Sequence, residues 1–145
     1  MKFFLSLMSI VFSFILICSN VWAEKPLAPE KIPGTIRVGA EETVELIVNT
    51  PNLVIIDSRK PIEYDKGHIQ SSIGLLNTVM TVEHLQKYAP DKSTPLLFYC
   101  NGERCLRSSK AATFALDAGY KLVYWFRGGW NEWVQKGMPI SKELK

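Results

Sequence analysis

Three runs of consecutive hydrophobic residues occur after residue 50 of the chain. They are LVII at 53–56, LLFY at 96–99 and LVYWF at 122–126, and polar residues follow each run. Runs without polar alternation are typical of strands that are buried on both faces of a parallel sheet. We therefore predict three central strands, and a further short strand at 35–38.

The segments between these strands have helical patterns. The segment that begins at Ala40 places apolar residues at helical spacing behind an acidic first turn, and the segment after Cys105 ends at Gly119, which suits a helix C-terminus. Strands that alternate with helices imply right-handed crossovers. The predicted fold class is thus α/β, with a mostly parallel central sheet flanked by helices on both faces. Helical segments are expected at 40–49, 61–65, 82–89, 108–119 and 130–136.

The N-terminal segment is predicted to be a secretory signal peptide, residues 1–23. Lys2 precedes an uncharged apolar run of about sixteen residues, and the small Ala23 suits a cleavage site. The run is shorter than the roughly 20 residues of a membrane-spanning helix. We therefore expect a periplasmic or secreted protein without stable membrane insertion after cleavage. The alternatives are an uncleaved N-terminal membrane anchor and a lipoprotein attached through Cys18, which the bulky Ile17 disfavours.

The remaining chain is long enough for one hydrophobic core. Residues 24–34 hold three prolines and a glycine and are predicted to be an extended leader, and residues 35–145 are predicted to form one domain. Without Lys2 the chain keeps 16 of its 17 Lys and Arg residues against 14 Asp and Glu. This balance includes no long basic run, so we expect no nucleic-acid partner. Cys100 and Cys105 remain, in a compartment where disulfides persist.

Candidate chemistry gathers where the predicted strands end. Asp57, Cys100 and Arg127 each stand just after a buried strand, and the carboxyl ends of parallel strands form the usual ligand-binding edge. Cys100 opens a polar loop that leads into a helix, where backbone N–H groups and the helix dipole favour an anion. We expect a lowered pKa and a nucleophilic thiolate at Cys100, with positive potential from Arg104 and Arg107. The alternative to a nucleophilic Cys100 is that this residue is a buried cysteine with only a structural role.

The neighbouring polar residues have more ordinary interpretations. Cys105 suits a resolving thiol, a second sulfur carrier or an inert residue, and spacing does not decide among them. No His or second cysteine pair lies near it, so we expect no metal. His68 follows a glycine bend, and we expect a structural residue there rather than a general base. Asp57 and Arg59 are expected to form an ion pair or to bond neighbouring loops.

These residues together resemble the rhodanese-like domain family over roughly residues 35–140. Such a resemblance implies an α/β fold and sulfur transfer without a cofactor. The loop cysteine, here Cys100, takes sulfane sulfur from a small donor such as thiosulfate and passes it as a persulfide to a thiol or cyanide, with a protein thiol as a further acceptor. The matching residues, in order, are Asp57-Ser58-Arg59, Glu63-Tyr64, Gly67-His68-Ile69, Tyr99-Cys100, Ser108 to Ala112, Gly119-Tyr120, Arg127-Gly128-Gly129-Trp130 and Trp133.

The resemblance carries over Cys100 but not the identity of each loop donor, so the surrounding residues are assigned from their place in the loop and at the strand ends. Asp57, Arg59 and His68 are expected to support the site. The oxyanion is expected to be held by the loop residues Asn101, Gly102, Glu103, Arg104, Cys105 and Arg107.

The loop is about two residues longer than the common single-domain pattern and resembles a bacterial variant with a Cys-Asn-Gly-x-x-Cys loop. Related phosphatases and arsenate reductases carry an arginine six positions after the cysteine, where this chain has Leu106. Two alternatives therefore remain beside sulfur transfer: thiol–disulfide exchange by Cys100 and Cys105, and a catalytically silent binding module.

Overall fold

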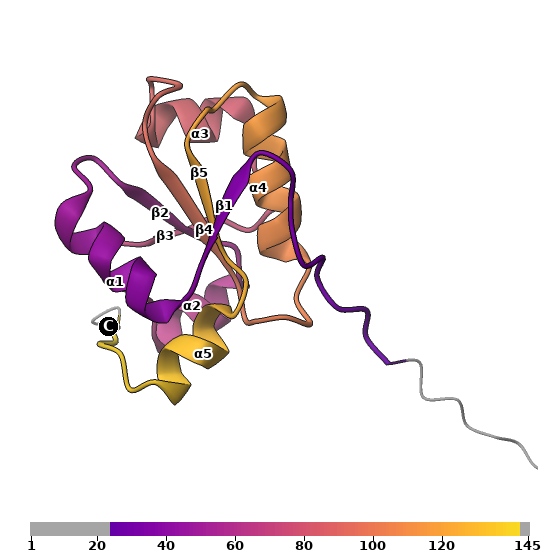
Figure 1. Ribbon diagram of the computed structural model, residues 1–145, viewed down its shortest axis with the longest axis vertical. Coiled ribbons are helices and arrows are strands. Elements are labelled where there is room, and N and C mark those ends of the chain that lie inside the picture. The colour runs from indigo at the N-terminus through magenta and orange to yellow at the C-terminus, as the bar shows by residue number, and fades with distance from the viewer. Residues whose placement is uncertain (1–23, 143–145) are drawn as a thin grey trace, which may run out of the picture.

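Five parallel strands form a single sheet in the order β1-β5-β4-β2-β3 (Figure 1). The computed structural model describes residues 24–142, so the predicted signal peptide lies outside the described residues. The order places β4 at the centre, which agrees with its uninterrupted hydrophobic sequence. The strands are β1 (Thr35–Val38), β2 (Val54–Asp57), β3 (Ile73–Gly74), β4 (Leu96–Tyr99) and β5 (Val123–Phe126).

The helices confirm the predicted alternation and lie close to the predicted bounds. They are α1 (Ala40–Asn49), α2 (Pro61–Lys66), α3 (Val82–Tyr88), α4 (Arg107–Asp117) and α5 (Gly129–Gln135). The prediction missed β3, because a strand of two residues has no hydrophobic run and forms only where it pairs with the end of β2. Across residues 24–142, no helix is long and apolar enough to cross a membrane.

Helices cover both faces of the sheet, as predicted. Alternate side chains of a strand point to opposite faces, so Leu96 and Phe98 of β4 pack with α3 and α4, whereas Leu97 and Tyr99 pack with α1 and α5. Figure 1 shows these two helix pairs on opposite sides of the strands. The face of α4 against the sheet consists of small residues, which let the helix approach closely: Ala111, Ala112 and Ala115.

The leader, residues 24–34, has no helix or strand but packs against the domain. Ala28 and Ile32 are buried in the same core cluster as α3 and α4. The Arg127 guanidinium donates to the carbonyl oxygens of Ala28 and Pro29, both at 3.0 Å. These contacts fasten the leader to the end of β5, beside the first turn of α4 (Figure 1).

The end of β4 is held against the start of α5 by an unusually close backbone approach. The Trp130 N–H donates to the Cys100 carbonyl at 2.8 Å, and the Asn131 N–H donates to the Asn101 carbonyl at 2.9 Å. Gly129 has a φ of +55°, and a Cβ added to it would overlap the Cys100 carbonyl. Only glycine satisfies both the left-handed backbone and the contact.

We predict that Gly129→Ala destabilises the protein more than Gly137→Ala does. Both glycines have a positive φ, +55° and +66°, but an added Cβ at Gly137 meets nothing within 4 Å. The control variant therefore carries only backbone strain, of order 1–3 kcal/mol. Urea denaturation should show an additional loss for Gly129→Ala of about 1 kcal/mol or more, because displaced packing adds to the strain. Equal losses in the two variants would contradict the importance of the Cys100 contact.

Candidate active site

Cys100 lies at the end of β4 with its thiol buried; the residue is 1 % exposed. Its Sγ donates to the Cys105 carbonyl at 3.2 Å and lies 3.2 Å from the Ser108 Oγ. The Trp125 Nε1–H donates to the same Ser108 oxygen at 3.1 Å. Because that oxygen already accepts a hydrogen bond from the indole, the Ser108 hydroxyl hydrogen is free to point to the Cys100 sulfur.

Cys105 is half-buried and lines a pocket of about 560 Å³ that the loop shares with α4. The Arg107 Nη1 lies 3.7 Å from the Cys105 Sγ. Among the described residues that line this pocket none is acidic, so its potential favours an anionic ligand. The cationic lining residues are Lys25, Arg104, Arg107 and Lys110.

The pKa of Cys105 is lowered from its ordinary value, and the pKa of Cys100 is raised. The hydrogen bond from the Cys100 thiol is the largest influence that lowers the pKa of Cys105, to about 6, and N–H groups of the loop and the Arg107 charge add to it. The same hydrogen bond, together with burial, raises the pKa of Cys100. The lowered pKa of Cys105 and the raised pKa of Cys100 therefore favour a thiolate on Cys105 over one on Cys100.

This arrangement corrects the expected lowered pKa of Cys100. The sequence suggested a nest of N–H groups around Cys100, and the Ser108 N–H does donate to its sulfur. Burial and the neighbouring Cys105 thiolate outweigh that contact. The turn at residues 102–105 is responsible, because it brings Cys105 back beside Cys100.

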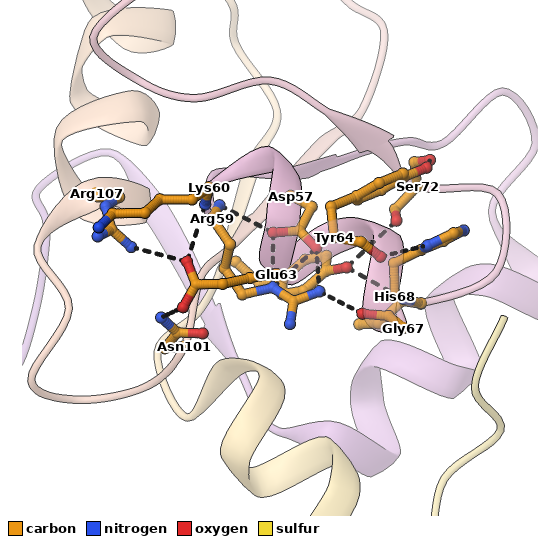
Figure 2. Close-up of polar contacts among 12 residues, drawn as sticks. Asp57, Arg59, Lys60, Glu63, Tyr64, Gly67, His68, Ser72, Asn101 and Arg107 are labelled. Atoms are coloured by element: carbon orange, nitrogen blue, oxygen red, sulfur yellow. Dashed lines mark hydrogen bonds and ion pairs between the residues drawn. The ribbon is translucent and has the colours of Figure 1, made fainter. Parts of the chain in front are cut away.

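Glu63, on α2, organises the loop from the side. Its Oε1 accepts from the Asn101 Nδ2 at 2.8 Å, and its Oε2 lies 3.6 Å from the Arg107 Nη1, as Figure 2 shows. Burial raises the pKa of Glu63, but the hydrogen bonds from Asn101 and from the Lys60 N–H, with the Arg107 charge, lower it overall. Glu63 was not among the predicted site residues, although it lies in the matching Glu63-Tyr64 pair.

Glu103 and Arg104, which were predicted to hold the oxyanion, contact the leader. The Glu103 carboxylate pairs with Arg127, and its carbonyl accepts from the Ala28 N–H at 2.6 Å. Arg104 forms an ion pair with Glu24 at 2.7 Å while it also lines the pocket. Arg127 stands at the predicted edge, but its contacts hold the leader and loop together.

The expected ion pair between Asp57 and Arg59 is present and buried. The Arg59 Nη2 lies 2.6 Å from the Asp57 Oδ2 and donates to the Gly67 carbonyl at 2.7 Å. The guanidinium also lies 4.3 Å from the centre of the Trp130 ring, a cation–π contact with α5. The pair thus joins β2 and the α2–β3 connection, as Figure 2 shows, and the contact with Trp130 adds α5.

His68 is held in the α2–β3 connection. Its Nδ1 lies 3.0 Å from the Tyr64 carbonyl, its ring stacks on the Tyr64 ring with centroids 3.9 Å apart, and its backbone pairs with Ser141. These contacts match the structural residue that we expected rather than a general base. Within residues 24–142 no group of three or more His, Cys, Asp or Glu side chains is arranged to hold a metal ion.

A family model described as the rhodanese-like domain matches residues 40–136, which contain the strands β2 to β5 and the cysteine loop. The chain belongs to the rhodanese-like domain family. It is 33 % identical over 107 residues to a rhodanese domain-containing protein, CG4456, of Drosophila melanogaster, covering 66 % of this chain and 94 % of that protein.

Two larger proteins contain a similar domain. A tRNA uridine(34) hydroxylase of Yersinia pestis is 29 % identical over 110 residues, which are 72 % of this chain and 30 % of that protein. The structure of a thiosulfate sulfurtransferase from Pseudomonas aeruginosa matches with a TM-score of 0.64 and 26 % identity, over 77 % of this chain and 21 % of that one. This chain therefore spans less than a third of either relative.

The predicted fold class also agrees with solved structures of lower identity. The polysulfide-sulfur transferase homodimer of Wolinella succinogenes has a TM-score of 0.60 at 19 % identity, over 76 % of this chain and 80 % of that one. This likeness shows the fold alone. The parallel sheet between two helical layers is thus the rhodanese-like architecture.

We predict that iodoacetamide modifies Cys105 in preference to Cys100 at neutral pH. Thiolate is the reactive form, so the rate should rise with pH around a midpoint near 6, the lowered pKa of Cys105. In Arg107→Gln the midpoint should rise by about one pH unit, because a cation close to the sulfur is lost. Peptide mapping after timed labelling measures both effects.

Arg104→Gln is the matched control, since it removes the same charge from the pocket while Arg104 pairs with Glu24. Its midpoint should stay closer to that of the unchanged protein. Preferential labelling of Cys100 would contradict the assignment of the thiolate.

Proposed function

We propose that the pair of thiols catalyses sulfur transfer, from an anionic sulfane donor such as thiosulfate to a thiol or cyanide, through a persulfide on Cys100. The observation that carries the proposal is the pair itself: two free cysteines, with the Cys100 thiol bonded to the Cys105 carbonyl, beside a pocket with cationic side chains. A thiolate is the nucleophile that attacks sulfane sulfur, and a cationic pocket stabilises both the donor and the departing anion. Two adjacent cysteines of this kind also argue against the alternative that the domain only binds a partner and has no catalytic activity.

The residues supply each part of the transfer. The donor anion enters between Arg107 and Lys110, which both line the pocket. Cys100 gives its proton to the Cys105 thiolate and attacks the outer sulfur of the donor. The sulfur–sulfur bond of the donor breaks, and sulfite leaves with the electron pair. The N–H and hydroxyl of Ser108 donate to the sulfur of Cys100 and stabilise its negative charge.

The relatives support this reaction class without defining the substrate. A thiosulfate sulfurtransferase and a tRNA uridine(34) hydroxylase both contain a domain similar to this chain. The sequence has no long run of basic residues, which disfavours a nucleic-acid substrate for this chain. Thiol–disulfide exchange is the second candidate, and it is favoured by two free cysteines that lie close enough for the Cys100 thiol to donate to the Cys105 carbonyl.

We further propose that residues 1–23 are a cleaved signal peptide and that the mature protein is periplasmic or secreted. The charged start, apolar run and small Ala23 support this proposal. N-terminal sequencing of protein recovered from the periplasm should begin at Glu24. A start at Met1 in a membrane fraction would favour the N-terminally anchored alternative instead.

We predict that Cys100→Ser abolishes thiosulfate-to-cyanide transfer. Loss of a nucleophile that acts as part of a unit removes nearly all turnover, and we expect a decrease of at least about 100-fold. Thiocyanate formation under steady-state conditions measures it, with circular dichroism to show that the near-isosteric variant is folded. Turnover at the unchanged rate in Cys100→Ser would rule out the mechanism. A folded, fully reduced parent protein without any transfer would favour thiol–disulfide exchange.

A further inference from the structure

We propose that Cys105 resolves the persulfide on Cys100, so that hydrosulfide is released and a Cys100–Cys105 disulfide remains for an external dithiol to reduce. This inference rests on the proposed sulfur transfer and defines its acceptor. The protein would then couple reduction of a sulfane donor to oxidation of a dithiol. Cyanide or a free monothiol would only intercept the intermediate.

The loop holds Cys105 directly against the sulfur that would carry the persulfide. The Cys105 N–H donates to the Gly102 carbonyl at 2.9 Å, so residues 102–105 form a turn that brings the chain back over Cys100. The Cys100 Sγ then contacts the Cys105 carbonyl at 3.2 Å, so the two cysteines lie side by side. A persulfide formed on Cys100 therefore has a thiol beside it before any outside acceptor arrives.

Access also favours the internal thiol. Cys100 is 1 % exposed, and on the side of α4 its sulfur lies against Ser108, whose hydroxyl accepts from the Trp125 indole. Cys105 is half-buried and lines the pocket. In the proposed reaction the outer sulfur of the small donor passes Cys105 to reach Cys100, whereas a bulkier external thiol that enters the pocket meets Cys105 first.

The resolving step is balanced without a further reactant. After sulfite has left, Cys100 carries a persulfide anion and Cys105 carries the proton that it accepted from Cys100. The Cys105 sulfur attacks the inner sulfur, the persulfide bond breaks, and the outer sulfur leaves with the electron pair and takes the proton as hydrosulfide. The sulfane sulfur is reduced to sulfide while the two cysteine thiols are oxidised to the disulfide.

Reduction of that disulfide returns the site to its starting state. The dithiol attacks Cys105, because its sulfur faces the pocket, and Cys100 leaves. The second thiol of the reductant then closes a disulfide of its own and frees Cys105, which a monothiol achieves only with a second molecule. Arg107 lies 3.7 Å from the Cys105 sulfur and stabilises the thiolate that is released.

The test compares the mature protein, residues 24–145, with its Cys105→Ser variant in a single turnover. Each protein is reduced, freed of reductant and checked by intact mass for free thiols, and then it receives thiosulfate alone. Hydrosulfide is measured before any reductant is added, since a reductant would release sulfide from any persulfide. Intact mass is measured in parallel on acid-quenched samples.

The parent protein should release one hydrosulfide per chain and lose two hydrogens in mass. Cys105→Ser should release at least tenfold less hydrosulfide and retain one added sulfur atom on Cys100. Dithiothreitol should return the parent protein to its reduced mass and permit a second equivalent of hydrosulfide to form.

A parent protein that keeps the added sulfur and releases no hydrosulfide, like the variant, would overturn the resolving role of Cys105 and leave sulfur transfer intact. Neither added sulfur nor hydrosulfide from either folded and reduced protein would overturn the proposed function as well. The two failures are therefore distinguishable in one experiment.

Discussion

The contact between the first turn of α5 and the Cys100 carbonyl is the constraint on which the rest of the site depends. Gly129 permits an approach that no Cβ would allow, and the Trp130 and Asn131 N–H groups bind carbonyls that would otherwise be unpaired as the chain leaves β4. The start of the loop is thereby fixed in the backbone itself. Two side chains then hold the rest of the loop. Glu63 of α2 binds Asn101, and Arg127, at the end of β5, binds Glu103.

A fixed loop makes the electrostatics of the two thiols unequal. Burial alone would raise the pKa of both, but Cys105 also receives hydrogen bonds and faces Arg107, so it holds the negative charge in place of Cys100. Two groups whose pKa values are driven apart in this way suit paired acid and base roles. In the proposed reaction the proton moves between the sulfurs of Cys105 and Cys100 and does not have to come from solvent.

The leader adds a constraint that lies outside the alternating strands and helices. Its carbonyl groups bind Arg127, whose charge is buried and therefore needs partners. The same guanidinium pairs with Glu103 of the loop. Residues far apart in sequence thus meet around one cation, and Lys25 of the leader becomes part of the pocket lining. The leader is irregular in backbone conformation but belongs structurally to the site.

The sequence by itself determined the central strands, the helices between them and the position of Cys100, because hydrophobic runs and helical spacing are local properties of the chain. It also predicted the Asp57–Arg59 pair, whose members are close in sequence. Only the tertiary structure decided the short strand β3, the role of Glu63 and the placement of the thiolate on Cys105. Each of these depends on the turn of a long loop or on a partner distant in sequence, and burial and hydrogen bonding are fixed only when such segments pack together.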